Sequence, residues 1–268
     1  MKQRFLIYST VLIVLCMAIL SLVKWDPSAT EAVETSNELL AFDTQIQYDV
    51  KEKVYPDFFY DVDSRFMMTI SKEALQKARS IRDFLPKDMT EPVVSYKSVS
   101  VVVFENNRQT AIHETGNNEA LTAAQIKLLR SFDYSTNFLI RADFLEKNPE
   151  NGELKDNYFS PHMTIVPEKQ AAYINGKDAF IEYLKENSKE KTTIVEEKKL
   201  QPGKVYFTVT KKGAISDVRL LTTSGYPSID TKMIELITNA PGKWEPAENS
   251  KGEKVEQKLV FSFGIVGC

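Results

Sequence analysis

The feature that most constrains this chain is an uncharged run of 19 residues, residues 5–23, near its amino terminus. Lys2 and Arg4 precede the run, and Lys24 and Trp25 follow it. At about 1.5 Å per residue a helix of this length spans roughly 28 Å, close to the ~30 Å hydrocarbon core of a bilayer. The run therefore predicts a single transmembrane helix, and the basic residues ahead of it favour an orientation with the amino terminus inside the cell.

Two other interpretations fit this segment less well. A cleaved signal peptide usually has an apolar core of about 7–15 residues that ends at a small-x-small site, whereas this run is longer and ends at Lys24 and Trp25. Lipid attachment at Cys16 is disfavoured because Leu15 stands where a lipobox has a small residue. We therefore expect an uncleaved single-pass membrane anchor, with the rest of the chain on the outer side of that membrane. The expected parts are an anchor over residues 1–25 and a tether over residues 26–64.

Composition narrows the function classes. The net charge is −3 and no long basic run is present, so the clustered Lys and Arg typical of nucleic-acid binding are missing. Cys16 lies in the apolar run and Cys268 ends the chain, which makes a disulfide between them implausible. His113 and His162 supply too few ligands for a zinc site, and neither has a nucleophile motif nearby. We expect no metal, no cofactor and no catalytic site.

The last part of the chain, residues 161–268, reads as a small α+β domain with an antiparallel sheet. Its apolar residues recur first at helical spacing, then in alternation, and Gly213 supplies a turn between two strands. Ser228 can cap the second helix, and the slip between Ile215 and Val218 suggests a β-bulge in the second strand. The expected elements are a helix over 177–187, strands over 205–209 and 215–220, a helix from 228 and a strand over 257–263.

Within residues 165–265 a set of residues recurs in a specific order. The chain carries a Val-x-Phe-x-Val strand, a Gly-x-Ile turn, an Ile-Asp pair at a helix start, the segment PGKWEPA and a closing Phe-x-Phe strand. The residues concerned are Val205, Phe207, Gly213, Asp230, Pro241, Trp244, Pro246, Phe261 and Phe263. In this order and spacing they resemble the TonB C-terminal domain family, and PGKWEPA is the most specific part. We expect structural roles for them, with Trp244 as a core wedge between helix and last strand.

The resemblance implies a single-pass inner-membrane energy transducer with its bulk in the periplasm, not an enzyme. Such a protein couples an inner-membrane motor of the ExbB and ExbD type to an outer-membrane transporter, and it docks onto an extended segment of that transporter. Docking of this kind uses the unpaired main chain of an edge strand. The residues expected to form this edge are Gly252, Glu253, Lys254, Val255, Glu256, Gln257 and Lys258.

Two departures from the family keep another function open. The expected anchor has no histidine, and a folded unit stands where a Pro-rich spacer is usual. A polyproline spacer gains about 3.1 Å per residue, whereas a folded unit of ~95 residues is only about 25–35 Å across. The alternative is a static envelope adaptor without energy coupling. An enzyme would instead require a concave pocket with convergent polar groups and shifted pKa values.

Residues 65–160 predict a second α+β unit with the same element order. We expect a helix over 71–84, and a helix opened by a capping box between Thr122 and Gln125, with Leu121 and Ile126 as a hydrophobic staple. The expected strands are 99–103, 110–114 and 138–144, with a turn at Asn106 and Asn107. The unit is either a divergent copy of the carboxyl-terminal domain or an unrelated α+β domain.

Overall fold

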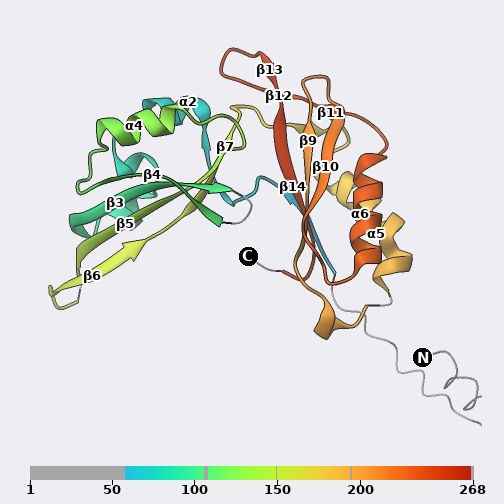
Figure 1. The fold of residues 1–268 in the computed structure, drawn as a ribbon, viewed down its shortest axis with the longest axis horizontal. Helices are drawn as coiled ribbons and strands as arrows, with labels where there is room; N and C mark the ends of the chain where they lie inside the picture. Colours follow the sequence, from blue (N-terminus) through green and yellow to red (C-terminus); the bar gives the residue numbers. More distant parts are fainter. Residues whose placement is uncertain (1–57, 106–107, 149, 194, 267–268) are drawn as a thin grey trace, which may run out of the picture. The chain divides into compact units, whose positions relative to one another are not determined.

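The computed structural model describes residues 58–266, apart from residues 106–107, 149 and 194 (Figure 1). The expected anchor over residues 5–23 and most of the expected tether lie outside these residues. In the part that is described, no helix combines the length and the apolar character needed to span a membrane. The described chain is an α+β protein dominated by sheet, with few helices.

The middle sheet is built mainly by residues of the expected middle unit. Its strand order is β2-β7-β5-β3-β4, and β6 pairs with β5. Neighbours are antiparallel except β2 and β7, which are parallel. The strands are β2 (Met68–Ser71), β3 (Val93–Glu105), β4 (Arg108–Gly116), β5 (Asn137–Lys147), β6 (Leu154–Phe159) and β7 (His162–Val166).

The helices of this unit confirm one sequence prediction and correct another. Thr122 and Gln125 form the expected capping box at the start of α4 (Ala123–Arg130). The single helix expected over 71–84 is wrong, because α2 (Lys72–Lys77) ends early and Ser80 pairs with Ala120 in a β-bridge. After Ser80 the chain resumes as the 3-10 turn η1 (Ile81–Asp83), and a further short helix, α3 (Lys87–Thr90), follows.

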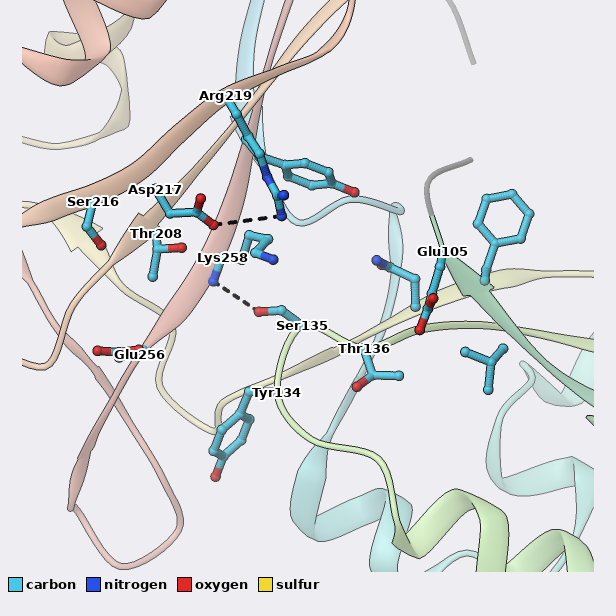
Figure 2. A pocket seen from close by; sticks show the side chains of 14 residues that line it. Glu105, Tyr134, Ser135, Thr136, Thr208, Ser216, Asp217, Arg219, Glu256 and Lys258 are labelled. Carbon is cyan, nitrogen blue, oxygen red and sulfur yellow. Dashed lines mark hydrogen bonds and ion pairs between the residues drawn. The ribbon is translucent and has the colours of Figure 1, made fainter. Parts of the chain in front are cut away.

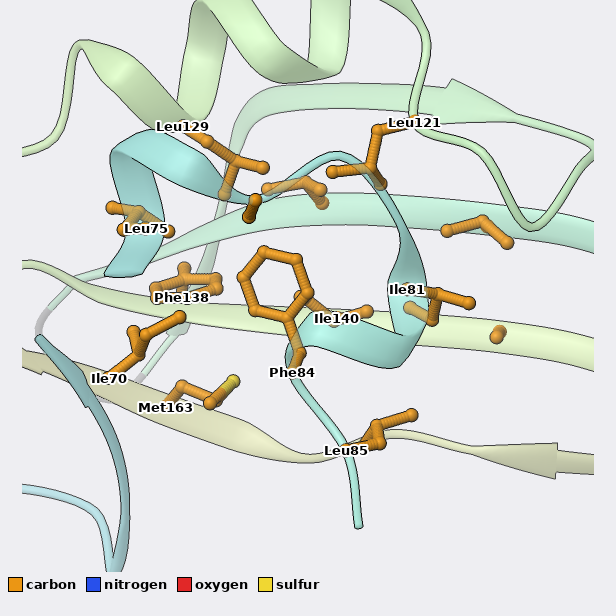
Figure 3. Packing of buried hydrophobic residues seen from close by; sticks show 14 of the residues in the cluster. Ile70, Leu75, Ile81, Phe84, Leu85, Leu121, Leu129, Phe138, Ile140 and Met163 are labelled. Atoms are coloured by element: carbon orange, nitrogen blue, oxygen red, sulfur yellow. The ribbon is translucent and has the colours of Figure 1, made fainter. Parts of the chain in front are cut away.

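The core of the middle unit lies between these helices and the sheet (Figure 3). Phe138 and Ile140 of β5 are fully buried, as are Val99 and Val101 of β3. An apolar stripe at helical spacing along residues 75–85 is buried even though the helix is interrupted. Its members are Leu75, Ala78, Ile81 and Leu85. Burial of this stripe stabilises the unit because apolar area is removed from water.

The carboxyl-terminal sheet is antiparallel, with strand order β1-β14-β9-β10 (Figure 1). Its strands are β1 (Phe59–Asp63), β14 (Gln257–Gly264), β9 (Gly203–Val209) and β10 (Ile215–Thr222). The helices α5 (Lys177–Thr192) and α6 (Pro227–Thr238) pack on one face. Shorter elements are η2 (Glu197–Lys199) and the pairs β8 (Ala172–Tyr173) with β11 (Trp244–Glu245), and β12 (Ala247–Glu248) with β13 (Lys254–Val255).

Several boundaries differ from the sequence predictions. β1 falls in the expected tether but pairs in the carboxyl-terminal sheet, and β7 falls beyond the expected boundary at residue 160 but pairs in the middle sheet. Helix α6 is capped at Tyr226 with Pro227 in its first position, and Ser228 is already helical. The bulge expected in β10 is confirmed, since the register shifts between Ser216 and Arg219.

The two sheets share part of their topology. In each, a hairpin is followed by a helix and then by a strand that pairs antiparallel with the first strand of the hairpin. The resulting orders are β5-β3-β4 and β14-β9-β10. This agreement is compatible with a divergent copy, which stays a hypothesis because a structural superposition is its test.

Candidate functional site

The apolar residues of the family-like set lie in the core of the carboxyl-terminal unit. Val205, Phe207, Phe261 and Phe263 are fully buried. The Trp244 ring contacts Phe180 of α5 at 5.2 Å and Phe207 of β9 at 5.5 Å between ring centroids. Trp244 is therefore a wedge between α5 and β9.

The PGKWEPA segment packs directly against the β9–β10 turn at Gly213. The φ of Gly213 is 74°, and a Cβ at this position would lie 2.1 Å from the Trp244 carbonyl oxygen. The backbone N–H of Trp244 in turn donates to the Gly213 carbonyl at 3.3 Å. Pro246 also lies against the turn, and the Tyr173 hydroxyl donates to the Pro241 carbonyl at the start of the segment. The segment therefore clamps the turn.

Asp230 has a structural setting in the first turn of α6. It is buried, and its carboxylate accepts hydrogen bonds from the Ser224 backbone N–H at 2.9 Å and the Thr223 hydroxyl at 2.5 Å. These bonds hold the loop that precedes the helix. Charge-assisted bonds of this type are stronger than neutral ones, which accounts for a buried acid here.

The residues expected to form the docking edge divide into two groups. Gly252, Glu253, Lys254 and Glu256 are exposed and Val255 is half-buried, and these five belong to or flank the β12–β13 hairpin. Gln257 and Lys258 open β14. Gln257 is buried; its side-chain oxygen accepts from the Ala171 backbone N–H, and its Nε2 donates to the Gln170 side chain. Their role in partner binding stays a prediction.

The expectation that the closing strand lies at the edge of its sheet is wrong. β14 pairs with β9 along its length, and on its other side Phe59–Asp63 pairs with residues Val260 to Gly264. Among the described residues, the outermost strands of this sheet are β1 and β10. β1 was not predicted from the sequence, although Tyr60 and Val62 alternate with Asp61 and Asp63 in a way typical of a half-buried strand.

β1 covers only part of the β14 border. Its pairing ends at Asp63 opposite Val260, and in the described chain no strand continues along Gln257–Leu259 on that side. There the Lys258 backbone N–H donates to the Ser135 hydroxyl at 3.0 Å (Figure 2). This stretch of main chain is therefore paired with a side chain and not with a strand.

The border at β10 is less suited to strand pairing. Asp217 in β10 has a φ of 48°, which is unusual for a residue other than glycine, and the pairing register shifts on both sides of Arg219 and Leu220. Arg219 and Asp217 form an ion pair at 3.7 Å on this strand. Bulges and charges of this kind protect a sheet edge from pairing with other strands.

A polar pocket of about 750 Å³ adjoins Lys258 (Figure 2). Tyr206 is one of its lining residues, and its ring lies 5.6 Å from the Lys258 Nζ and 6.0 Å from the Arg219 Cζ. Burial raises the pKa of the Tyr206 hydroxyl, and the charges of Arg65 and Arg219 partly offset that rise. In the described chain no group of three or more His, Cys, Asp and Glu residues is placed to hold a metal ion.

The histidines do not line this pocket. His113 is exposed, and its Nδ1 bonds the Ala111 carbonyl. His162 packs between Phe66 and Phe104, with both ring centroids 5.0 Å away. Burial, and secondarily the charge of Arg65, lowers the pKa of the His162 imidazole. A neutral imidazole packed against aromatic rings is typical of a structural residue.

Comparisons of this chain with known protein families, with curated protein sequences and with solved structures find no match.

Proposed function

We propose that this chain is a TonB-like periplasmic docking protein, anchored in the inner membrane through residues 5–23. It binds an extended segment of an outer-membrane transporter by strand addition at the β14 border and couples that transporter to an ExbB/ExbD-type motor. The observation that carries the proposal is the stretch Gln257–Leu259, where the Lys258 N–H bonds a serine hydroxyl in place of a strand. Main-chain groups of this kind accept an extended peptide with little dependence on its sequence.

Two further observations support the proposal. Apart from short elements, the chain runs α5, β9, β10, α6, β14, which is the helix-strand-strand-helix-strand order expected from the sequence, and the two helices pack on one face of the sheet. The PGKWEPA segment clamps the β9–β10 turn through Gly213 and Trp244, which gives its most specific residues a structural purpose. We propose docking and not catalysis because Asp230, Trp244 and the two histidines all have structural settings.

The second candidate function is a static envelope adaptor that uses the same border. The observation that favours it is the folded middle sheet, which stands where a long extended spacer would give reach across the periplasm. Both functions use the same surface, so the identity of the bound partner separates them.

The test is site-specific photocrosslinking in cells, with partners identified by mass spectrometry. The crosslinking residue is placed at Lys254 or Glu256, which are exposed beside β14, and at Lys212 as a matched exposed control in the β9–β10 turn. We expect an outer-membrane transporter to be captured from positions 254 and 256 and not from 212. Capture of inner-membrane or cell-wall partners alone would assign the adaptor function, and equal capture from all three positions would exclude this border.

A further inference from the structure

The β14 border is already occupied by a strand of the same chain. β1 precedes β14 by almost the whole described sequence, yet it pairs antiparallel from Phe59 opposite Gly264 to Asp63 opposite Val260. We propose that β1 is an internal occupant of the docking position, and that the partner is an extended segment with the same side-chain alternation that takes its place. This inference rests on the proposed function and specifies the chemistry of the partner.

One side of the occupied position selects an aromatic and an aliphatic residue. Val62 is buried in the carboxyl-terminal core. The Tyr60 ring lies 6.0 Å from that of Phe261, and its hydroxyl hydrogen-bonds the Ser188 hydroxyl of α5 at 2.8 Å. The Lys185 Nζ lies 5.8 Å from the centre of the same ring. A partner segment therefore needs an aromatic residue and a branched aliphatic residue two positions apart.

The other side selects carboxylates. Asp61 and Asp63 alternate with the core-facing residues, and the Lys177 Nζ of α5 lies 2.6 Å from Asp61 and 4.0 Å from Asp63. Exposed ion pairs of this kind contribute little net affinity, so their main effect is to favour an acidic segment over a basic one.

β1 is held more lightly than the strands it joins. Of its five residues only Val62 is buried, whereas most residues of β9 and β14 are buried. At Ser64 the chain turns away, and the Ser64 hydroxyl donates to Gln170 at 3.2 Å. Replacement of β1 therefore gives up few apolar contacts.

The uncovered part of β14 gives an incoming segment a place to begin. β14 has 8 residues and β1 has 5, and the difference corresponds to the stretch Gln257–Leu259. A segment that continues past the Asp63 position would pair along this stretch. Its main chain would then accept the Lys258 N–H in place of the Ser135 hydroxyl. The partner segment is accordingly longer than β1, with about three further residues in an extended conformation.

A covalent lock on β1 tests the inference. In the full-length chain in detergent micelles, with Cys16→Ser and Cys268→Ser, the variant Asp61→Cys/Ser262→Cys places two thiols at facing positions of β1 and β14. The probe is the fluorescein-labelled peptide FYDVDTVT, which carries the β1 sequence and three added residues. Fluorescence anisotropy measures its affinity before and after oxidation. We expect oxidation to weaken binding at least tenfold, and reduction to restore it.

The matched control lock is Thr208→Cys/Ser216→Cys, at facing positions of β9 and β10. Its oxidation should change the affinity less than twofold, because β1 remains free. The control peptide FYDDTVVT has the same composition, but no aromatic residue stands two positions from an aliphatic one, so we expect at least tenfold weaker binding. Equal affinity for the two peptides, or for the locked and unlocked β1 forms, would overturn the inference.

The other possible occupant of this position is β1 of a second copy of the chain, exchanged between two molecules. Val62→Ser loosens β1, and light scattering then measures the mass of the chain. Monomers with stronger binding of FYDVDTVT support a partner segment, and stable dimers that ignore the peptide would overturn it.

Failure of this inference and failure of the proposed function are distinguishable. If the lock blocks the peptide but crosslinking in cells captures no transporter, the proposed function fails and internal occupation of the border stands. If crosslinking from position 256 captures a transporter equally with β1 locked and unlocked, docking stands and displacement of β1 is excluded.

Discussion

Gly213 and Gly252 adopt nearly the same backbone angle in different surroundings. Their φ values are 74° and 75°, a region that other residues occupy at a cost of about 1–2 kcal/mol. A Cβ on Gly252 would meet nothing within 4 Å, whereas one on Gly213 would collide with the Trp244 carbonyl oxygen. A substitution at Gly252 therefore measures backbone strain alone, whereas one at Gly213 measures backbone strain and a steric clash together.

We predict that Gly252→Ala lowers the free energy of unfolding by about 1 kcal/mol, the cost of the backbone angle alone. Gly213→Ala should cost several kcal/mol, because the turn has to move away from the PGKWEPA segment. Urea denaturation of the full-length variants, followed by circular dichroism, measures both values. Equal losses would show that the contact between the turn and Trp244 does not hold.

At the scale of elements, local patterns predicted more than long-range pairings did. The capping box at Thr122 and the bulge in β10 are written in a few neighbouring residues, and both are confirmed. The end of α2 was not predictable from its apolar stripe, because the interruption comes from a bridge between Ser80 and the distant Ala120. β1 was missed for the same reason, since its pairing partner lies at the other end of the described chain.

The start of α4 gives a prediction at this scale. The Gln125 side chain accepts from the Thr122 N–H at 2.9 Å and donates to the Val99 carbonyl of β3 at 2.7 Å, so it joins the helix to the sheet. We predict that Thr122→Ala costs about 1 kcal/mol of stability, as N-cap losses do. Gln125→Ala should cost about 2–3 kcal/mol because it also removes a buried hydrogen bond and leaves a space. Urea midpoints of the two variants give the comparison, and a smaller loss for Gln125→Ala would contradict it.

At the scale of the whole molecule, the two sheets share part of their strand order, but each includes a strand that the sequence prediction placed elsewhere. The middle sheet takes β7 and the carboxyl-terminal sheet takes β1. A boundary drawn from element order alone therefore cuts through both sheets. The prediction that the closing strand forms the sheet edge failed for the same reason, because β1, which pairs with it, is remote in sequence.

A fragment without β1 tests this dependence. We predict that residues 168–268, produced alone, unfold at a lower temperature than the carboxyl-terminal unit of the full chain, because the β14 border and the space beside Phe261 are uncovered. A peptide of residues 58–66 should raise that temperature in a concentration-dependent way. At a peptide concentration of one hundred times its Kd, the free energy of unfolding should increase by about 2.7 kcal/mol. Calorimetry measures both effects, and a fragment indifferent to the peptide would argue against the pairing.

During synthesis Phe59–Asp63 leaves the ribosome long before Gln257–Gly264 exists. The earliest described strand must therefore wait, unpaired, while the middle sheet is completed, and it finds its place only when translation is nearly over. Contacts between such remote segments form slowly because a long loop has to close first. For most of its synthesis, a nascent chain of this protein therefore carries an aromatic, acidic segment without its pairing partner. We expect chaperones that bind the nascent chain to contact this segment.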